Sequence, residues 1–220
     1  MATKTFYLSE DQTAVLTTKW GLFYRNFEAF YNGQALGPAV SSDELRQGCT
    51  YNLPDGRVFT AQLLRNQGLQ EVQLLLDGQP VPGSNTHPQE RIKQAWYALL
   101  FIGLLSTTLG IVAESISSEG LRKLGLGWPS AVEGIIFLGL GWWGYRSRSP
   151  LAFYLALGLL VLDKMLTVAA AVSEGGKGFG GFGSIFLWFF FCVAIFRGAK
   201  GASELREQER QAKAEALRIF

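Results

Sequence analysis

The stretch KQAWYALLFIGLLSTTLGIVAE, residues 93–114, decides the fold class of this chain. From Gln94 to Ala113 it carries no charged residue over 20 positions. A helix of that length rises about 30 Å, which is the thickness of the hydrocarbon core of a bilayer. The stretch therefore predicts a membrane-spanning helix, and the other segments can be placed around it.

Three later stretches have a similar apolar character and predict further spans at about 129–146, 150–172 and 182–199. Arg146 and Arg148 close the second of these, and FLWFFF makes the fourth rich in aromatic residues. A polar segment after Glu114 can hold a short interfacial helix, and the glycine-rich segment EGGKGFGGFGS separates the third and fourth spans. We expect a four-helix transmembrane bundle over 86–199 and a helical tail over 200–220 that continues the fourth span.

The composition supports this division of the chain. Charged residues make up 17% of the 220 residues, against about 25% in soluble domains. The charges are concentrated outside 94–199, so residues 1–92 read as a soluble protein. The net charge of +2 argues against a general nucleic-acid-binding surface. Cys49 lies in the soluble part and Cys192 in an apolar span, so we expect no disulfide between them and a reducing compartment.

Residues 1–85 predict a small all-β domain. Short segments rich in β-branched and aromatic residues, such as TFYLS and AVLTTKW, favour strands, and Phe23–Tyr31 reads as a longer one. Asn32-Gly33, Asp55-Gly56 and Asp77-Gly78 are hairpin-turn dipeptides, because their residues tolerate the positive φ that tight turns need. We therefore expect an antiparallel sandwich or barrel-like arrangement of about six to eight strands.

One short helix is predicted inside this domain. Ser41 and Glu44 have the spacing of a capping box, and Gly48 can end the helix in a left-handed conformation.

Two segments of the β domain resemble each other. FEAFYNGQALG at 27–37 and EVQLLLDGQPVPG at 71–83 both run from a strand through Asn/Asp-Gly-Gln to a short apolar return. The likeness is either an internal repeat or two hairpins that use the same turn chemistry. We favour the second interpretation, because hairpin turns converge on these residues.

Lysine and arginine near the ends of the spans predict the orientation. Nine of these residues fall on one side and three (Arg122, Lys123 and Lys177) on the other. The positive-inside rule then places the β domain, the loop between the second and third spans and the tail in the cytoplasm. Four spans put both termini on the same side, which agrees with that count. The N-terminus has no apolar run of signal-peptide length, so the first span is expected to act as the insertion signal.

The candidate functional residues are charges inside the spans. Asp163 and Lys164 lie twelve residues or more beyond Leu151, near the predicted bilayer centre, where a charge costs about 2.5–3.5 kcal/mol. Because adjacent side chains on a helix diverge by about 100°, we expect that the two do not simply neutralise each other. Glu133 and Glu114 are candidate partners for Lys164. We favour a structural polar clamp, or a charge pair facing a partner in an oligomer, over a proton- or ion-coupled pathway.

The sequence gives no catalytic constellation, no metal site and no cofactor motif. His87 is the only histidine and stands before Pro88, where it or Thr86 can cap the first helix. One histidine without neighbouring acids does not build a zinc site. The segment around Lys177 lacks the glycine and the Ser/Thr that a phosphate-binding loop requires.

Residues 42–64 (SDELRQGCTYNLPDGRVFTAQLL) and 70–96 (QEVQLLLDGQPVPGSNTHPQERIKQAW) carry a resemblance. With the spans that follow, they resemble uncharacterised bacterial and cyanobacterial integral membrane proteins. In that group a β domain with LPDG-type and DGxPxPGS-type turns precedes several membrane helices. The resemblance implies a fold and a bacterial inner (plasma) or thylakoid membrane, and no activity.

From these features we expect a non-catalytic docking, scaffold or assembly protein. The β domain would bind a protein partner, because it offers hairpin edges suited to strand addition and the chain offers no catalytic set. The expected partners are membrane lipid, a protein bound by the β domain or a second copy bound through the spans, and no nucleic acid. The alternative is a small oligomeric transporter or channel-like bundle that uses the charges within the spans.

Overall fold

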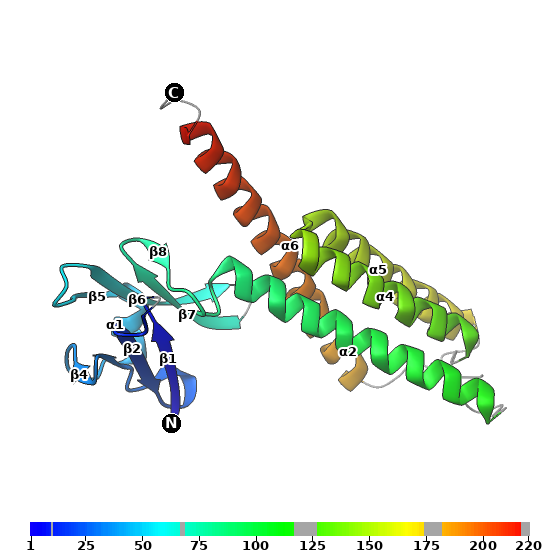
Figure 1. The fold of residues 1–220 in the computed structure, drawn as a ribbon. Helices are drawn as coiled ribbons and strands as arrows, with labels where there is room; N and C mark the ends of the chain where they lie inside the picture. Colours follow the sequence, from blue (N-terminus) through cyan, green and yellow to red (C-terminus); the bar gives the residue numbers. More distant parts are fainter. Residues whose placement is uncertain (10, 67–68, 117–126, 174–181, 217–220) are drawn as a thin grey trace. The chain divides into compact units, whose positions relative to one another are not determined.

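The computed structural model describes residues 1–9, 11–66, 69–116, 127–173 and 182–216. The chain divides into two compact units, Met1–Glu90 and Arg91–Phe220 (Figure 1). Each unit is described by itself below. The short interfacial helix predicted after Glu114 and most of the predicted glycine-rich loop lie outside the described residues.

The first unit is an all-antiparallel β domain, as the sequence predicts. Its eight described strands form two four-stranded sheets, each a simple meander in chain order. The first sheet contains β1 (Ala2–Tyr7), β2 (Val15–Trp20), β3 (Glu28–Tyr31) and β4 (Gln34–Ala35). The second contains β5 (Cys49–Asn52), β6 (Val58–Asn66), β7 (Leu69–Leu76) and β8 (Gln79–Pro80).

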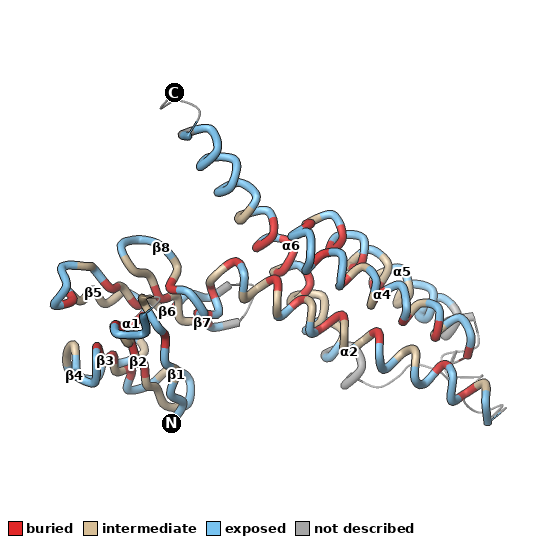
Figure 2. Tube along the Cα trace, viewed as in Figure 1, coloured by how far each residue is buried: buried red, intermediate tan, exposed pale blue. Residues whose placement is uncertain are grey.

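One apolar core serves both sheets. Leu16 from β2 and Phe59 from β6 are fully buried in it, together with Leu45 from the helix α1 (Ser42–Gln47). Burial alternates along β2 and β3, as expected for strands with one face turned to a core (Figure 2). No strand pairing joins the two sheets among the described residues, so the arrangement fits the sandwich alternative better than a closed barrel.

The predicted turns and cap form as expected. Asn32 and Gly33 both have positive φ, as do Asp77 and Gly78, which is the geometry of type I′ hairpins. The capping box is complete, because the Ser41 side chain accepts a hydrogen bond from the Glu44 backbone N–H and the Glu44 side chain accepts one from Ser41 N–H. Gly48 ends α1 as predicted and has a positive φ, but with φ 96° and ψ 129° it lies outside the left-handed helical region that the sequence predicts.

The two sheets are built on the same plan. Asn32 N–H donates to the Val15 carbonyl and Asn32 Oδ1 accepts from Val15 N–H. Asp77 makes the same pair of bonds with Val58, all four at 2.8 Å. The last two residues of the third strand also pair identically with the short fourth strand in both sheets. The equivalence covers the start of the second strand, the end of the third strand and the short fourth strand of each sheet.

The predicted long strand over Phe23–Tyr31 is wrong at its beginning. Within this range only Glu28–Tyr31 forms a strand, and Leu22–Tyr24 forms a short 3₁₀ turn, η1. Phe23 and Tyr24 have φ values of 56° and 60°, in the left-handed region that bulky residues rarely adopt. The strand was predicted because aromatic residues favour strands. The structure instead forms a loop here, in which Gly21 N–H donates a hydrogen bond to the Arg25 carbonyl at 2.7 Å.

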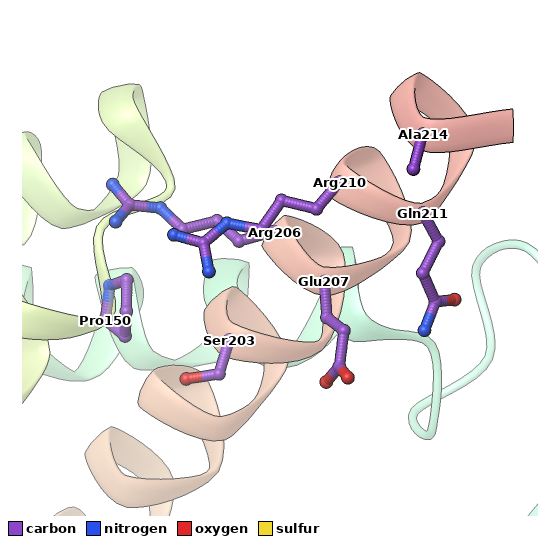
Figure 3. Close-up of a pocket in the computed structure, with 7 residues that line it drawn as sticks. All are labelled: Pro150, Ser203, Arg206, Glu207, Arg210, Gln211 and Ala214. Atoms are coloured by element: carbon purple, nitrogen blue, oxygen red, sulfur yellow. The ribbon is translucent and has the colours of Figure 1, made fainter. Parts of the chain in front are cut away.

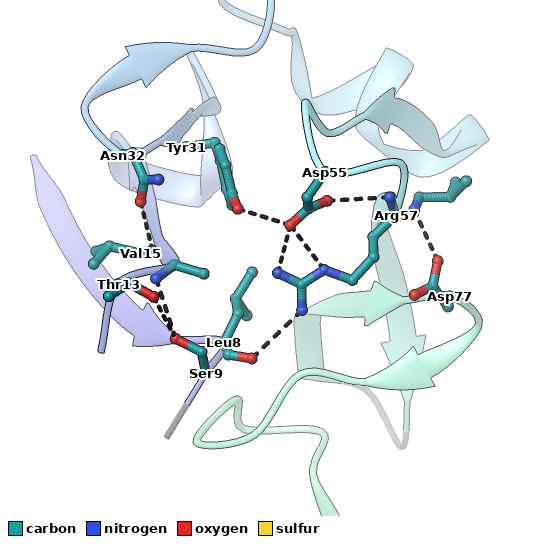
Figure 4. A network of polar contacts seen from close by, with 11 residues as sticks. Leu8, Ser9, Thr13, Val15, Tyr31, Asn32, Asp55, Arg57 and Asp77 are labelled. Carbon is teal, nitrogen blue, oxygen red and sulfur yellow. Dashed lines mark hydrogen bonds and ion pairs between the residues drawn. The ribbon is translucent and has the colours of Figure 1, made fainter. Parts of the chain in front are cut away.

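A polar network links the two sheets across their shared end (Figure 4). Tyr31 Oη, at the end of β3, donates to Asp55 Oδ2 in the turn between β5 and β6, at 2.7 Å. Arg57 holds the same carboxylate through Nη2 at 2.6 Å and reaches the Leu8 carbonyl at 3.4 Å. The Asp55 turn therefore fixes the second sheet to the first.

The second unit is helical. Its described helices are α2 (Pro88–Ser115), which begins at the end of the β domain, α4 (Trp128–Ser147), α5 (Pro150–Ser173) and α6 (Phe182–Ala216). These bounds lie close to the predicted spans. Pro88 opens α2 as expected, and His87 Nδ1 accepts from Gln89 N–H at 3.3 Å, so His87 acts as a cap. The predicted helical tail continues α6 without a break as far as Ala216.

Small residues bring α2 and α4 into close contact. A Cβ placed on Gly134 would lie 2.6 Å from the Gly103 carbonyl oxygen and the Thr107 backbone nitrogen. A Cβ on Gly110 would lie equally close to Ala131 N. Glycine at these positions lets the two backbones approach, which is the packing role that the sequence predicts for glycines in the spans.

Two helices are long and apolar enough to cross a membrane by length and composition, Pro88–Ser115 and Pro150–Ala169. Only 22% of the most apolar window of each is buried, so neither resembles a helix enclosed in a soluble core. The predictions at 129–146 and 182–199 are helical where described, but the described residues there do not meet the same criterion. The structure therefore supports two of the four predicted spans.

Candidate functional site

Asp163 and Lys164 lie in the middle of α5 and form an ion pair. Lys164 Nζ is 3.5 Å from Asp163 Oδ2, so the expectation that adjacent charges would not neutralise each other is wrong. The 100° divergence holds for the Cα–Cβ directions, whereas the four-carbon stem of lysine is long enough to fold back onto its neighbour.

This ion pair lies on an exposed part of α5. The side chains of Lys164 and Asp163 are 44% and 37% exposed within the chain. The neighbouring Leu162, Met165 and Leu166 are each more than half exposed. The charges thus stand on an apolar surface that the described part of the unit leaves uncovered.

Glu133 on α4 belongs to the same region. It is half-buried, and the charges of both Asp163 and Lys164 act on it. It makes no ion pair with Lys164 among the described contacts. The structure therefore brings three of the four predicted residues together as a loose cluster on α4 and α5.

Glu114 lies elsewhere. It stands near the C-terminal end of α2, and its Oε2 is 3.6 Å from the Cβ position of Gly127, which precedes the first turn of α4. A carboxylate at the N-terminus of a helix is favoured by the helix dipole and by the N–H groups of the first turn. Glu114 therefore has a structural explanation that is separate from the Asp163 cluster.

The described side chains offer little for catalysis. No group of three or more His, Cys, Asp or Glu residues within the described ranges could hold a metal ion. Burial raises the pKa of the Cys49 thiol, which keeps it protonated and weakens it as a nucleophile.

A second surface feature was missed by the sequence analysis. Leu22 and Phe23, in η1 of the β domain, are 83% and 75% exposed. We call these two residues the apolar tip. Single exposed apolar residues are common on soluble proteins, but here two large ones are adjacent and one stands in a strained backbone. This combination of strain and exposure is typical of binding sites.

Contacts of Tyr24 attach the loop that carries the apolar tip to the rest of the β domain. Tyr24 Oη donates to the Gln70 carbonyl in β7 at 3.2 Å, which ties the loop to the second sheet. The Tyr24 ring also lies 6.0 Å from the ring of Trp20. These contacts fix the base of the loop while Leu22 and Phe23 project from it, so the tip is preorganised.

The sequence contained one signal for this loop. Gly21 and Asn26 bracket LFYR, and both are residue types that favour turns. Because the five residues Phe23, Tyr24, Phe27, Phe30 and Tyr31 are aromatic, the strand signal concealed the turn signal.

The sheet edges offer a weaker docking surface. β1 pairs only with β2 among the described strands, so its other edge is open. Lys4 stands on this strand and donates to Asn85 Oδ1 at 2.7 Å. A charged residue on an edge strand disfavours pairing with another chain, and the apolar tip is therefore the better candidate.

Comparison with protein-family models, with curated proteins and with solved structures finds no match to this chain. The resemblance to uncharacterised bacterial and cyanobacterial membrane proteins stays a prediction.

Proposed function

We propose that this protein is a membrane-anchored docking protein without catalytic activity, whose β domain binds a protein partner through the apolar tip. The observation that carries the proposal is the exposure of Leu22 and Phe23 on a preorganised loop. Burying these two side chains in a partner removes apolar surface from water, which favours binding. Because the loop is already ordered, little conformational entropy is lost on binding, as is typical of anchor residues in interfaces.

The partner is a protein with an apolar pocket that takes up the tip. Arg25 follows the tip in the chain and is exposed. Lys19 does not add to this charge, because it lies opposite Glu28 across β2 and β3 and its Nζ lies 4.6 Å from the centre of the Phe30 ring.

The anchor is a bundle of four membrane spans with both termini in the cytoplasm. Large apolar side chains exposed on α4, among them Val132, Ile135 and Trp142, support a lipid-facing role for this helix as well as for α2 and α5. The lysine and arginine distribution supports the orientation. The expected location is a bacterial inner or thylakoid membrane.

A photo-crosslinking amino acid at position 23 of the full-length membrane-embedded protein tests the docking proposal. We expect one protein adduct, and a complex of fixed stoichiometry when its intact mass is measured. Gln34 is the matched control, because it is exposed at another hairpin of the same sheet. Leu22→Ser should reduce the adduct at position 23. Adducts with lipid alone, or equal yields at positions 23 and 34, would contradict the proposal.

A second candidate function is that of an oligomeric transporter or channel-like bundle. The observation in its favour is the Asp163–Lys164 pair on the exposed face of α5, where a second copy could cover it. Asp163→Asn distinguishes the two candidates. A transporter should lose flux while its helices remain folded, whereas a docking protein should keep its partner adduct at position 23.

A further inference from the structure

A basic cleft lies where α5 begins, against the C-terminal part of α6 (Figure 3). Its volume is about 680 Å³, which is within the range of small-molecule sites. One wall is Pro150, the first residue of α5, and the other is a face of α6. The lining residues are Pro150, Ser203, Arg206, Glu207, Arg210, Gln211 and Ala214.

Two arginines dominate the cleft. Arg206 and Arg210 are one helical turn apart on α6, and both project toward the start of α5, while Glu207 and Gln211 point away from it (Figure 3). Like charges at this spacing destabilise a helix. The cleft therefore concentrates positive charge on one side.

These two arginines have no acidic partner among the described residues, although their neighbours do. Arg91 pairs with Glu204 at 3.3 Å, and Arg148 pairs with Glu209 at 2.7 Å. Glu204 and Glu209 are thus used by arginines of other segments, whereas Glu207 lines the cleft itself. Within the described residues no carboxylate forms an ion pair with Arg206 or Arg210, and their guanidinium groups are suited to bidentate binding of phosphate.

The start of α5 adds to the attraction for an anion. The first backbone N–H groups of a helix have no acceptor within the helix, and the helix dipole places partial positive charge there. Since α5 runs for 24 residues, its N-terminal end provides this field beside the two guanidinium groups.

The cleft lies at the level along the helices where the headgroup of a lipid beside the candidate span would lie. Pro150 begins the apolar helix Pro150–Ala169, so the cleft lies at the polar end of a candidate span. Trp142, Trp143 and Tyr145 are exposed at the end of α4 that directly precedes it. Exposed tryptophan and tyrosine at the end of a span mark the membrane–water interface.

We infer that this cleft binds the phosphate of an anionic phospholipid headgroup through Arg206 and Arg210. The inference rests on the membrane anchoring proposed above and is independent of the docking of a partner by the apolar tip. A bound lipid would neutralise the two adjacent charges and fix the C-terminal part of α6 against the start of α5.

Native mass spectrometry of the full-length protein in detergent tests the inference, with phosphatidylglycerol and phosphatidylcholine as probes. We expect preferential binding of phosphatidylglycerol. The double variant Arg206→Gln/Arg210→Gln should bind it about thirtyfold more weakly, given the usual contribution of a basic residue to binding at an anionic membrane surface. Arg206→Lys/Arg210→Lys should fall between the two, because it keeps the charge and loses the bidentate geometry.

The matched control is Lys200→Gln/Lys213→Gln, which removes two charges from the same helix outside the cleft. This control should keep the lipid preference, and circular dichroism should show unchanged helicity in every variant. Equal losses in the two double variants, or equal binding of both lipids, would overturn the inference. Arginine-dependent binding of inorganic phosphate without a preference for phosphatidylglycerol would overturn the lipid assignment. Carbonate extraction of the wild-type chain from membranes would instead overturn the anchoring proposal.

Discussion

Tyr31 Oη donates a 2.7 Å hydrogen bond to Asp55 Oδ2 and thereby joins the third strand of one four-stranded sheet to the turn between the first two strands of the other. Arg57 binds the same carboxylate at 2.6 Å. The hydrogen bonds from Arg57 and then Tyr31 hold the pKa of Asp55 far below its usual value of 3.8. The hydrogen bond to Asp55 raises the pKa of Tyr31.

We predict that Asp55→Asn destabilises the β domain by about 1–2 kcal/mol, because it weakens hydrogen bonds to a charged group. Hydrogen exchange at the amides of β6 and β7 in the full-length protein measures this loss. The control Asp43→Asn removes an exposed ion pair with Arg46 and should cost less than about 0.5 kcal/mol. Equal effects of the two substitutions would show that the Asp55 network does not join the sheets.

The same network predicts the pH dependence of stability. Since the folded pKa of Asp55 is depressed, its contribution is complete above about pH 4 and is lost as the pH falls through the folded value. Since the folded pKa of Tyr31 is raised, its contribution is complete below about pH 10 and is lost as the pH rises further. Hydrogen exchange at several pH values should show both losses in the wild type, and the acid loss should be smaller in Asp55→Asn.

Gly134→Ala should destabilise the helical unit by about 1–3 kcal/mol, because the new methyl group would overlap backbone atoms of Gly103 and Thr107. Thermal unfolding in detergent measures the effect. Gly139→Ala on the same helix is the control, since nothing lies within 4 Å of its Cβ position. That variant should be neutral or more stable, because alanine favours helix over glycine by up to about 1 kcal/mol. A neutral Gly134→Ala would refute the close contact of α2 with α4.

Phe23→Asn should stabilise the β domain by about 1 kcal/mol, because asparagine tolerates the left-handed backbone that strains phenylalanine at φ 56°. The same change should abolish partner binding at the tip. Leu22→Asn should weaken binding without stabilising the fold, because Leu22 does not have positive φ. Hydrogen exchange in β2 and β3 gives the stability, and crosslinking from a neighbouring tip position gives the binding. A loss of stability in Phe23→Asn would count against strain at this residue.

The single histidine should titrate below 6.5, because partial burial lowers the pKa of His87. Its contribution to stability is then complete above about pH 6.5 and is lost as the pH falls through the folded value. Glu90 opposes the shift, so Glu90→Gln should lower the pKa of His87 further. An NMR titration reports this residue without ambiguity, since the chain has one histidine. A pKa above 6.5 would contradict the half-buried capping position.

Features set by neighbours in sequence were predictable. The two type I′ turns and the capping box at Ser41 follow from local residue preferences, and the helix bounds follow from runs of apolar residues. Interactions that depend on distant segments or on side-chain reach were not predictable. The hydrogen bond between Tyr31 and Asp55 joins residues of two different sheets. The ion pair between Lys164 and Asp163 forms because the long lysine side chain bends back onto its neighbour.

The candidate sites likewise include one that the sequence could predict and one that it could not. The charges inside the predicted spans were visible because they interrupt apolar runs. The structure brings Glu133 near Asp163 and Lys164, but Glu114 lies elsewhere. The cleft at Arg206 and Arg210 was not visible, because it depends on which arginines find acidic partners after folding.

The two matching meanders of the β domain differ most between their second and third strands. β6 and β7 pair continuously from Phe59 with Leu76 to Asn66 with Leu69, whereas β2 and β3 separate after Lys19 with Glu28. The apolar tip occupies this early separation. The long pairing of β6 and β7 thus supplies a rigid frame for the domain, and the short pairing of β2 and β3 leaves room for the tip loop. A change of partner would need to alter only a few residues of this loop while both sheets stayed constant.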